Sequence, residues 1–304
     1  MNVVQTDQQD TPQTITLMVN VRSRRGRQVV HQATQLLRNA GIHVVSVAVE
    51  RPEQAETLLK REVVRGAASV IVGGGDGTLS HAAGLLRNTK TALAVLPLGT
   101  GNTFARSIGV PLDLRGAIRV IAAGHRVQVD VGLANDQVFL NSVGLGISAE
   151  IARTLTADVK RRFGLLAWPL KGLKAIWRHR ALDLDVRTGT GEFHVHTHQL
   201  LVANGRYVAG PLRAAPDASV SDGQLDLLTF GDGGLMSLLR SGSLWASGRN
   251  IPRLQKAQLE IESRNGPVWV SMDGEVVQAT KLTLSIANQA LWVVVPEGFD
   301  ARHS

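Results

Sequence analysis

A glycine-rich segment is the clearest sign of chemistry in this sequence. Residues 70–86 are VIVGGGDGTLSHAAGLL, in which an apolar run is followed by a glycine turn and then by a helical stretch. Glycine has no Cβ atom, so backbone N–H groups at such a turn can approach phosphate oxygens closely. The segment therefore predicts a phosphate-binding turn made of Gly73, Gly74, Gly75, Asp76, Gly77 and Thr78.

Asp76 is the unusual member of this turn. A carboxylate repels a phosphate unless a magnesium ion lies between them or the carboxylate handles a proton, so Asp76 indicates chemistry or metal as well as binding. The alternative is a tight strand-to-helix turn in which Asp76 caps the helix. The segment lacks the GxxxxGK[ST] pattern of a Walker A loop and the third glycine of a GxGxxG dinucleotide motif.

A second loop of the same kind follows the next apolar run. In residues 93–111, Gly99, Thr100, Gly101 and Asn102 combine small residues, a hydroxyl and an amide at the end of an expected strand. Ligands of parallel sheets bind at the carboxyl ends of the strands, so two loops on consecutive strands would lie side by side. Taken alone, GTGN is more often an ordinary turn.

The elements that would position these loops follow from the hydrophobic pattern. From Ile15 to about Asp130, β-branched runs alternate with helical segments, which predicts βαβ units around a parallel sheet. After about Gln128, strands of period two follow one another, which predicts a β-rich second domain. We expect an α/β domain at 14–128 and a β-rich domain at 129–289, with a last strand near 290–298 that could return to the first.

Composition narrows the choice of partners and location. The 304 residues include 33 Lys plus Arg against 25 Asp plus Glu, a net charge of +8 that favours an anionic partner such as phosphate or acidic lipid. There is no cysteine, which excludes disulfides, thiolate nucleophiles and zinc fingers. No apolar run reaches the roughly 18 residues that span a bilayer, so we expect a cytoplasmic protein whose membrane contact is peripheral.

The two loops carry a family resemblance. GGDGT at 74–78 and PLGTGN at 97–102 resemble the catalytic domain of the diacylglycerol kinase family of lipid kinases, and GGDGT is shared with sphingosine kinases and NAD kinases. The resemblance extends along most of the chain. It includes the Asn20 segment and the stretches 129–151, 215–230 and 270–277. It implies a nucleotide-binding α/β domain joined to a β-sandwich, with ATP and a lipid meeting in the cleft between them.

The resemblance also implies roles for particular residues. Gly74 to Thr78 and Thr100 would hold the ATP phosphates, with Asn102 nearby and Asp76 at the reacting end. In VSMDGEVV, Glu275 would be the general base that takes the proton of the acceptor hydroxyl, with Asp273 beside it. From the residues alone, Asp-Gly between alternating apolar residues favours a hairpin turn, and the two interpretations are compatible.

A magnesium site is implied in the second domain. Asp222 falls where relatives bind a structural Mg²⁺, helped by backbone carbonyls that map to Ser219 and Gln224, and Asp130 would join that network. The alternative is a set of solvated turn carboxylates. The implied cofactors are therefore ATP and Mg²⁺.

Four positions depart from the family pattern. Val21 replaces a proline, Ser80 and His81 replace the usual Asn-Glu after GGDGT, and Thr103 replaces an aspartate. A missing acidic position in the cleft is compatible with altered nucleotide handling, a different acceptor or weak activity.

A basic segment indicates a membrane partner. Residues 153–180 contain eight Lys or Arg and one Asp, with apolar residues at helical spacing, as expected of a helix at an anionic lipid surface. The alternative is a helix packed on its own domain with a solvated basic face. Nucleic acid is not predicted, because no reader motif is present. His194, His196 and His198 share a strand face, but exposed edge histidines explain them better than a metal site.

The predicted function is an ATP- and magnesium-dependent lipid kinase that phosphorylates a hydroxyl of a diacylglycerol-like lipid. One alternative is a soluble kinase of a small molecule or of NAD. Another is a catalytically silent regulator that binds nucleotide or lipid, suggested by Thr103 and Ser80-His81. The sequence leaves the oligomeric state open, a homodimer included.

Overall fold

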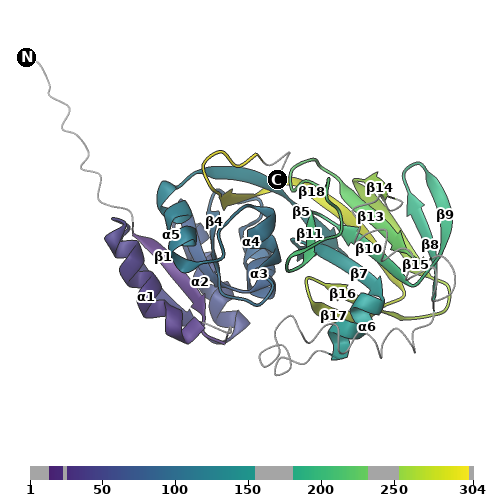
Figure 1. Cartoon of the computed structure of the whole chain (residues 1–304), viewed down its shortest axis with the longest axis horizontal. Helices are drawn as coiled ribbons and strands as arrows, with labels where there is room; N and C mark the ends of the chain where they lie inside the picture. The colour runs from purple at the N-terminus through teal and green to yellow at the C-terminus, as the bar shows by residue number, and fades with distance from the viewer. Residues whose placement is uncertain (1–13, 23–25, 155–180, 232–252, 301–304) are drawn as a thin grey trace, which may run out of the picture.

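The computed structural model describes residues 14–22, 26–154, 181–231 and 253–300. The chain forms an α/β part and a β-rich part that lie side by side along the longest axis (Figure 1). The elements of the first part are β1 (Ile15–Asn20), α1 (Gly26–Asn39), β2 (Val44–Val49), α2 (Pro52–Val64), β3 (Ser69–Gly74), α3 (Asp76–Leu86), β4 (Ala92–Pro97), α4 (Thr103–Ser107) and α5 (Leu114–Ala123).

The β-rich part holds most of the remaining elements. They are β5 (Arg126–Ala134), β6 (Gln137–Phe139), β7 (Ser142–Gly146), α6 (Ile147–Thr154), β8 (Leu182–Thr188), β9 (Gly191–Thr197), β10 (Gln199–Ala203), β11 (Tyr207–Ala209), β12 (Leu212–Arg213), β13 (Leu225–Phe230), β14 (Arg253–Lys256), β15 (Gln258–Ser263), β16 (Val268–Met272), β17 (Glu275–Ala279) and β18 (Lys281–Val294).

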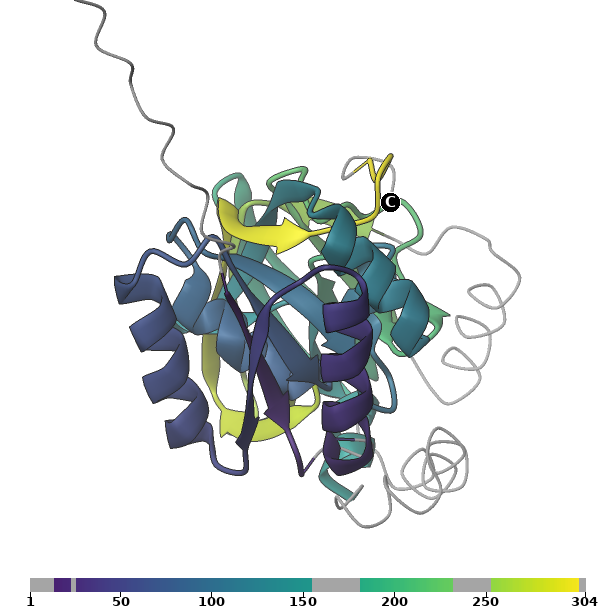
Figure 2. The ribbon, with the colours of Figure 1, turned by 90° about the vertical axis from the view of Figure 1, so that its left-hand side faces the viewer.

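The first part is built on a parallel sheet with the order β2-β1-β3-β4. Helices α1 and α2 lie on opposite faces of this sheet, as Figure 2 shows, and they contact α5 and α3 respectively. Because helices cover both faces, the central strands are apolar throughout, and Leu17, Met18, Ile71 and Leu93 are fully buried. The predicted α/β class is confirmed for this part.

The second part is a sandwich of two sheets. A six-stranded antiparallel sheet, ordered β14-β13-β10-β7-β16-β17, packs against the β5, β18, β15 and β8 region of the larger sheet. Leu145 and Val202 of the first sheet share one apolar core with Val186, Ile261 and Leu284 of the second. Side chains alternate between core and surface along these strands, as the period of two predicts. The predicted β-sandwich is confirmed.

Strand β18 belongs to both parts. Its N-terminal half pairs with β15, most of its length pairs with β5, and Val293 pairs in parallel with Leu93 of β4. The ladder with β5 is irregular between Ala287 and Leu291, where Gln289 has a φ of 48°. A single strand therefore runs from the sandwich into the edge of the parallel sheet.

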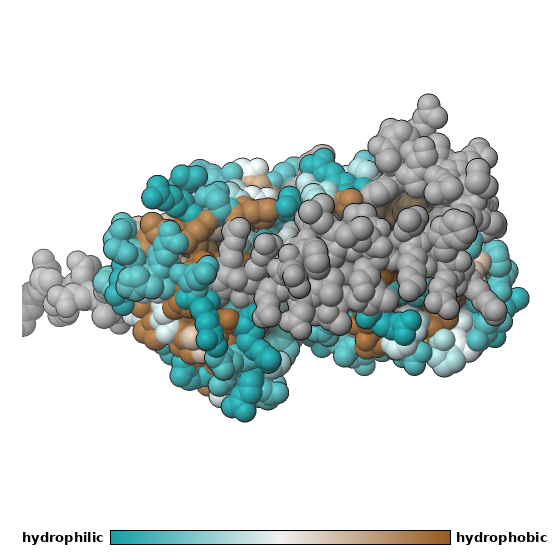
Figure 3. Space-filling view, turned by 60° about the horizontal axis from the view of Figure 1, so that its bottom comes forward, coloured by the Kyte–Doolittle hydropathy of each residue, from teal (hydrophilic) through white to brown (hydrophobic). Residues whose placement is uncertain are grey.

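The described surface has scattered apolar side chains. On the face drawn in Figure 3, brown hydrophobic areas lie among hydrophilic ones over the α/β half. The large hydrophobic residues that are exposed in the described part are Val45, Val64, Phe193, Leu212 and Val277. No helix among the described residues is long and apolar enough to cross a membrane. Of the basic segment 153–180, only the first two residues, at the end of α6, are described. Residues 155–180 lie outside the described residues.

Candidate functional site

The two glycine loops pack against each other backbone to backbone. A Cβ atom added at Gly99 would lie 2.6 Å from the Cα atom of Gly75, so neither loop has room for a side chain at this contact. Gly75 is the N-cap of α3 and offers no side-chain hydrogen bond to the first turn of that helix. The amide groups at the start of α3 are thus left to a ligand or to water, which suits phosphate oxygens.

Gly99→Ala tests this contact. The new methyl group would collide with backbone, so we expect the free energy of unfolding to fall by about 1–3 kcal/mol and nucleotide binding to weaken. Chemical unfolding and nucleotide titration measure the two effects. Gly189→Ala is the matched control, because an added Cβ there has no neighbour within 4 Å, and equal losses in both variants would contradict the close packing.

Asp76 connects the two loops through its carboxylate. It accepts hydrogen bonds from the backbone N–H of Phe104 at 3.0 Å and from the hydroxyl of Thr103 at 3.2 Å. Thr103 Oγ1 in turn accepts from the N–H of Gly210 at 2.9 Å. Burial raises the pKa of Asp76, the bond from Phe104 lowers it, and the nearby Asp273 carboxylate raises it further. Asp76 therefore caps α4 of the second loop and not its own helix α3.

The other predicted residues of the second loop shape the loop itself. The Asn102 side chain is buried, and it both accepts from Gly99 N at 2.8 Å and donates to Gly99 O at 3.1 Å. A Cβ atom at Gly101 would lie 3.1 Å from Asp76 Oδ2, so glycine allows the carboxylate to approach. Thr100 lies between Gly99 and Gly101 in the loop that follows β4. In β3, Gly73 makes room for Leu98 and Val19.

The hairpin between β16 and β17 contains the predicted acidic pair. Met272 pairs with Glu275, which leaves Asp273 and Gly274 as a two-residue turn with φ angles of 46° and 89°. Two successive positive φ angles define a type I′ turn, the form that suits the twist of a hairpin. The turn interpretation is thus present in the structure, and it places Glu275 at the first position of β17.

The Asp273 carboxylate faces inward, not toward the cleft. The residue is partly exposed, but its carboxylate accepts four hydrogen bonds, from Ser80 Oγ at 2.6 Å and from the N–H groups of Leu140 at 2.6 Å, Asn141 at 3.0 Å and Ser142 at 3.1 Å. Ser80 belongs to α3, Leu140 and Asn141 connect β6 to β7, and Ser142 is the first residue of β7. Asp273 therefore attaches the hairpin to the glycine-loop helix and to the connection between the two sheets of the sandwich. A direct catalytic role for Asp273 stays a prediction.

Ser80→Ala tests this attachment. Removing the hydroxyl takes away one donor to a buried carboxyl group, so we expect the free energy of unfolding to fall by about 1–3 kcal/mol. Chemical unfolding measures it. Ser148→Ala is the matched control, since its buried hydroxyl has no hydrogen-bond partner in the described structure and its loss should cost much less. If both variants lose the same stability, the Ser80 bond contributes nothing.

The desolvated carboxyl group of Asp273 should also make stability depend on pH. Burial raises its pKa above the ordinary value of 3.8, so the folded protein keeps this proton to a higher pH than the unfolded chain. The free energy of unfolding then falls as pH rises above about 4. We expect Asp273→Asn to flatten this dependence in urea unfolding between pH 4 and 8. An unchanged slope would contradict it.

A cleft of about 320 Å³ brings the hairpin and the first glycine loop together. It is lined by Asn20, Val49, Glu50, Arg51, Pro52, Ala55, Gly77, Thr78, His81 and Glu275. Glu275 Oε1 lies 3.8 Å from where a Cβ atom of Gly77 would be, and Asn20 Nδ2 donates to Thr78 Oγ1 at 2.9 Å. Four predicted residues, Asn20, Gly77, Thr78 and Glu275, therefore share one cleft.

The β2–α2 connection forms the wall that sequence reasoning missed. Val49 ends β2, Glu50 and Arg51 form the connection, and Pro52 begins α2, at the same edge of the parallel sheet that carries the glycine loops. The rule that ligands bind at this edge could have drawn attention to them. Of the departures from the family pattern, His81 lines the cleft, whereas Ser80 and Thr103 bond to buried carboxyl groups.

The predicted magnesium residues form a turn at the start of β13. Asp222 is exposed, and its Oδ1 accepts from Gln224 N at 3.0 Å, while Ser219 is buried nearby. The Asp130 carboxylate accepts from Gly223 N and Gln289 N, both at 2.7 Å, and burial raises its pKa. No group of three or more His, Cys, Asp or Glu side chains in the described residues could hold a metal. Carboxylate and carbonyl oxygens suit Mg²⁺, and the site stays a prediction.

The chain matches two family models and several named relatives. The diacylglycerol kinase catalytic domain matches residues 14–134, and the YegS C-terminal NAD kinase beta sandwich-like domain matches residues 141–295. A Chromohalobacter salexigens protein named "Probable lipid kinase YegS-like" is 31% identical over 280 residues, which cover 88% of this chain and 89% of that one. The chain belongs to the YegS-like branch of the diacylglycerol kinase family.

A second relative and a solved structure are similar to the chain over most of its length. A Pseudomonas putida protein with the same name is 32% identical, covering 80% of this chain and 82% of its own. A Bacillus anthracis str. Sterne crystal structure described as a diacylglycerol kinase has a TM-score of 0.73 at 19% identity, covering 95% of this chain and 98% of its own. The predicted family and the predicted enzyme class, a kinase with an alcohol acceptor, are confirmed.

Proposed function

We propose that this protein is an ATP-dependent lipid kinase that transfers the γ-phosphoryl group to a hydroxyl of diacylglycerol or a related glycerolipid. The observation that carries the proposal is the position of Glu275. A hairpin of the six-stranded sheet brings this exposed carboxylate into the same cleft as Gly77 and Thr78 of the glycine turn. The names of the relatives support a lipid as the acceptor.

The glycine loops fit the phosphate end of a nucleotide. The backbone contact between Gly75 and Gly99 excludes side chains where phosphates would approach, and the start of α3 adds the positive end of a helix dipole. Gly74 to Thr78, with Thr100 and the Asn20–Thr78 pair beside them, would hold these phosphates. Bound Mg²⁺ would neutralise phosphate charge, and Asp222 with the carbonyls of Ser219 and Gln224 would hold a structural ion.

Glu275 would be the general base. It would accept the proton of the acceptor hydroxyl as that oxygen bonds to the γ-phosphorus and the bond to the ADP oxygen breaks. Asp76 would lie at the reacting end of the phosphates, held between the two loops by its hydrogen bond from the Phe104 N–H of α4. The rest of the rate enhancement would come from positioning and charge neutralisation.

The membrane-facing part of the proposal rests on charge. The segment 153–180 carries seven net positive charges and would attract an acidic lipid surface, where a diacylglycerol resides. This implies a cytoplasmic enzyme that associates peripherally with the membrane.

Transfer of label from radiolabelled ATP tests the proposal. The acceptors are diacylglycerol in vesicles with acidic phospholipid, diacylglycerol in neutral vesicles, glycerol and NAD, and products are separated by thin-layer chromatography. Label in lipid, enhanced by acidic vesicles, is the expected result. Label in glycerol or NAD instead would indicate a soluble kinase. Nucleotide binding without ADP release for any acceptor would indicate a silent regulator.

A further inference from the structure

The edge strand β2 has an open, uncharged side. It pairs with β1 alone and ends the larger sheet, and its sequence VVSVAV contains neither charge nor proline. The carbonyls of His43 and Val49 accept from the N–H groups of Ile15 in β1 and of Val21 just after it, so the alternating backbone groups of Ser46 and Ala48 point to the free edge. Val45 is 53% exposed on this strand. Such an edge is a template for pairing with another strand.

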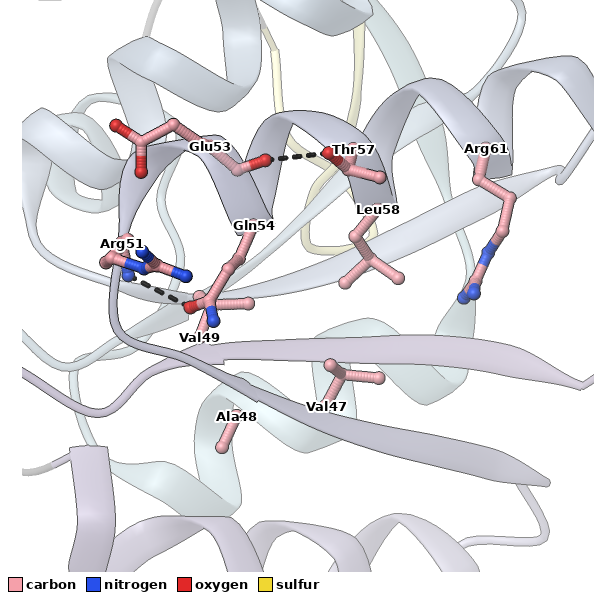
Figure 4. A pocket seen from close by; sticks show the side chains of 9 residues that line it. All are labelled: Val47, Ala48, Val49, Arg51, Glu53, Gln54, Thr57, Leu58 and Arg61. Carbon is pink, nitrogen blue, oxygen red and sulfur yellow. Dashed lines mark hydrogen bonds between the residues drawn. The ribbon is translucent and has the colours of Figure 1, made fainter.

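A groove of about 490 Å³ runs between this strand and helix α2, as Figure 4 shows. Its strand side is formed by Val47, Ala48 and Val49. Its helix side includes Glu53 and Arg61, which lie toward opposite ends of the groove in Figure 4.

The charges along this face of α2 are arranged antisymmetrically. Glu53, Thr57 and Arg61 are four residues apart, so they form one stripe that is acidic at the start of the helix, neutral in the middle and basic at its end. Val64, which is 88% exposed, continues the stripe by one turn. Reversing the direction of the stripe places Glu53 opposite Arg61 and Arg61 opposite Glu53, so these two charges complement each other across a two-fold axis.

We propose that β2 and α2 form the interface of a two-fold symmetric homodimer. A two-fold axis between two β2 strands would pair them antiparallel and extend the sheet across both copies. The two α2 helices would then run antiparallel on the same face of the extended sheet. Glu53 of each copy would face Arg61 of the other, with the two Thr57 residues near the axis.

The interface would adjoin the cleft described above. Val49 and Arg51 line both the groove and the cleft, so the wall of the cleft is also the end of the edge strand. Pairing of β2 would brace this wall from outside. Glu53, Thr57 and Arg61 line the groove but not the cleft, so a test of the dimer interface does not depend on the proposed kinase activity.

A charge-swap experiment tests the interface. Analytical ultracentrifugation of the full chain should give twice the monomer mass of 32.6 kDa. Glu53→Arg alone and Arg61→Glu alone should each shift the protein to monomer, because like charges then face each other. An equimolar mixture of the two variants should form heterodimers, since every pair across the axis is again opposite. The double variant should also dimerise.

Controls address folding and the alternatives. Arg61 also contacts the buried Glu62, so thermal unfolding must show that Arg61→Glu folds. If it does not, Ala48→Pro replaces it, because it removes an N–H that points to the free edge and should also give monomers. A monomeric wild type, dimers that survive both single swaps, a mixture that stays monomeric, or larger oligomers would each overturn the proposal.

Discussion

Asp76→Asn is expected to abolish phosphoryl transfer while the protein stays folded. The asparagine oxygen can still accept the N–H of Phe104, and its amide can still meet the Thr103 hydroxyl, so the contact between the two loops survives. What disappears is the negative charge. Turnover should therefore be lost while the melting temperature is maintained or raised, because burial opposes the charged form of this group.

ADP release with the lipid acceptor and thermal unfolding measure these two effects. Thr103→Val is the informative companion variant, because it removes the hydroxyl bonds to Asp76 and Gly210 but leaves the carboxylate in place. It should lower stability and retain part of the activity. If Asp76→Asn keeps wild-type turnover, the carboxylate serves only as the cap of α4.

Glu275→Gln is expected to lower kcat by ~100-fold or more, the usual contribution of a general base. Glu275 begins β17 on the cleft side of the hairpin, and the hydrogen bonds of Asp273 that hold the hairpin are untouched by the change. The fold and nucleotide binding should therefore be unaffected. Steady-state kinetics with ATP and vesicle-bound diacylglycerol separate kcat from KM.

A second carboxylate variant shows whether the loss is specific to Glu275. Glu297→Gln is the control, since this exposed carboxylate lies outside the cleft-lining residues. A kcat within threefold of wild type for Glu275→Gln would assign the proton transfer to another group.

The sequence predicted the glycine loops and their contact because both signals are local. Each loop follows a buried parallel strand, and the geometry of parallel sheets brings the ends of β3 and β4 together without further information. The same holds for the hairpin, since Asp-Gly between apolar residues specifies a type I′ turn on its own. These parts depend on residues that are close in the chain.

The inward direction of Asp273 could not be predicted in this way. Its partners Ser80 and Leu140 are 193 and 133 residues away in the sequence, and they meet only when both parts have folded. The bond between Thr103 and Asp76 has the same origin, because a threonine next to a glycine turn gives no hint of its acceptor. The self-complementary stripe on α2 likewise appears only once the edge strand beside it is known.

The shared strand β18 limits how substrates can enter. Two domains that are joined only by loops can rotate freely against each other. Here the α/β part and the β-rich part share strand β18, which pairs with strands of both. The pairing of β18 with β5 is interrupted between Ala287 and Leu291, where the N–H of Gln289 donates to the Asp130 carboxylate instead. Rotation of one part against the other would therefore have to break or bend the backbone pairs of β18.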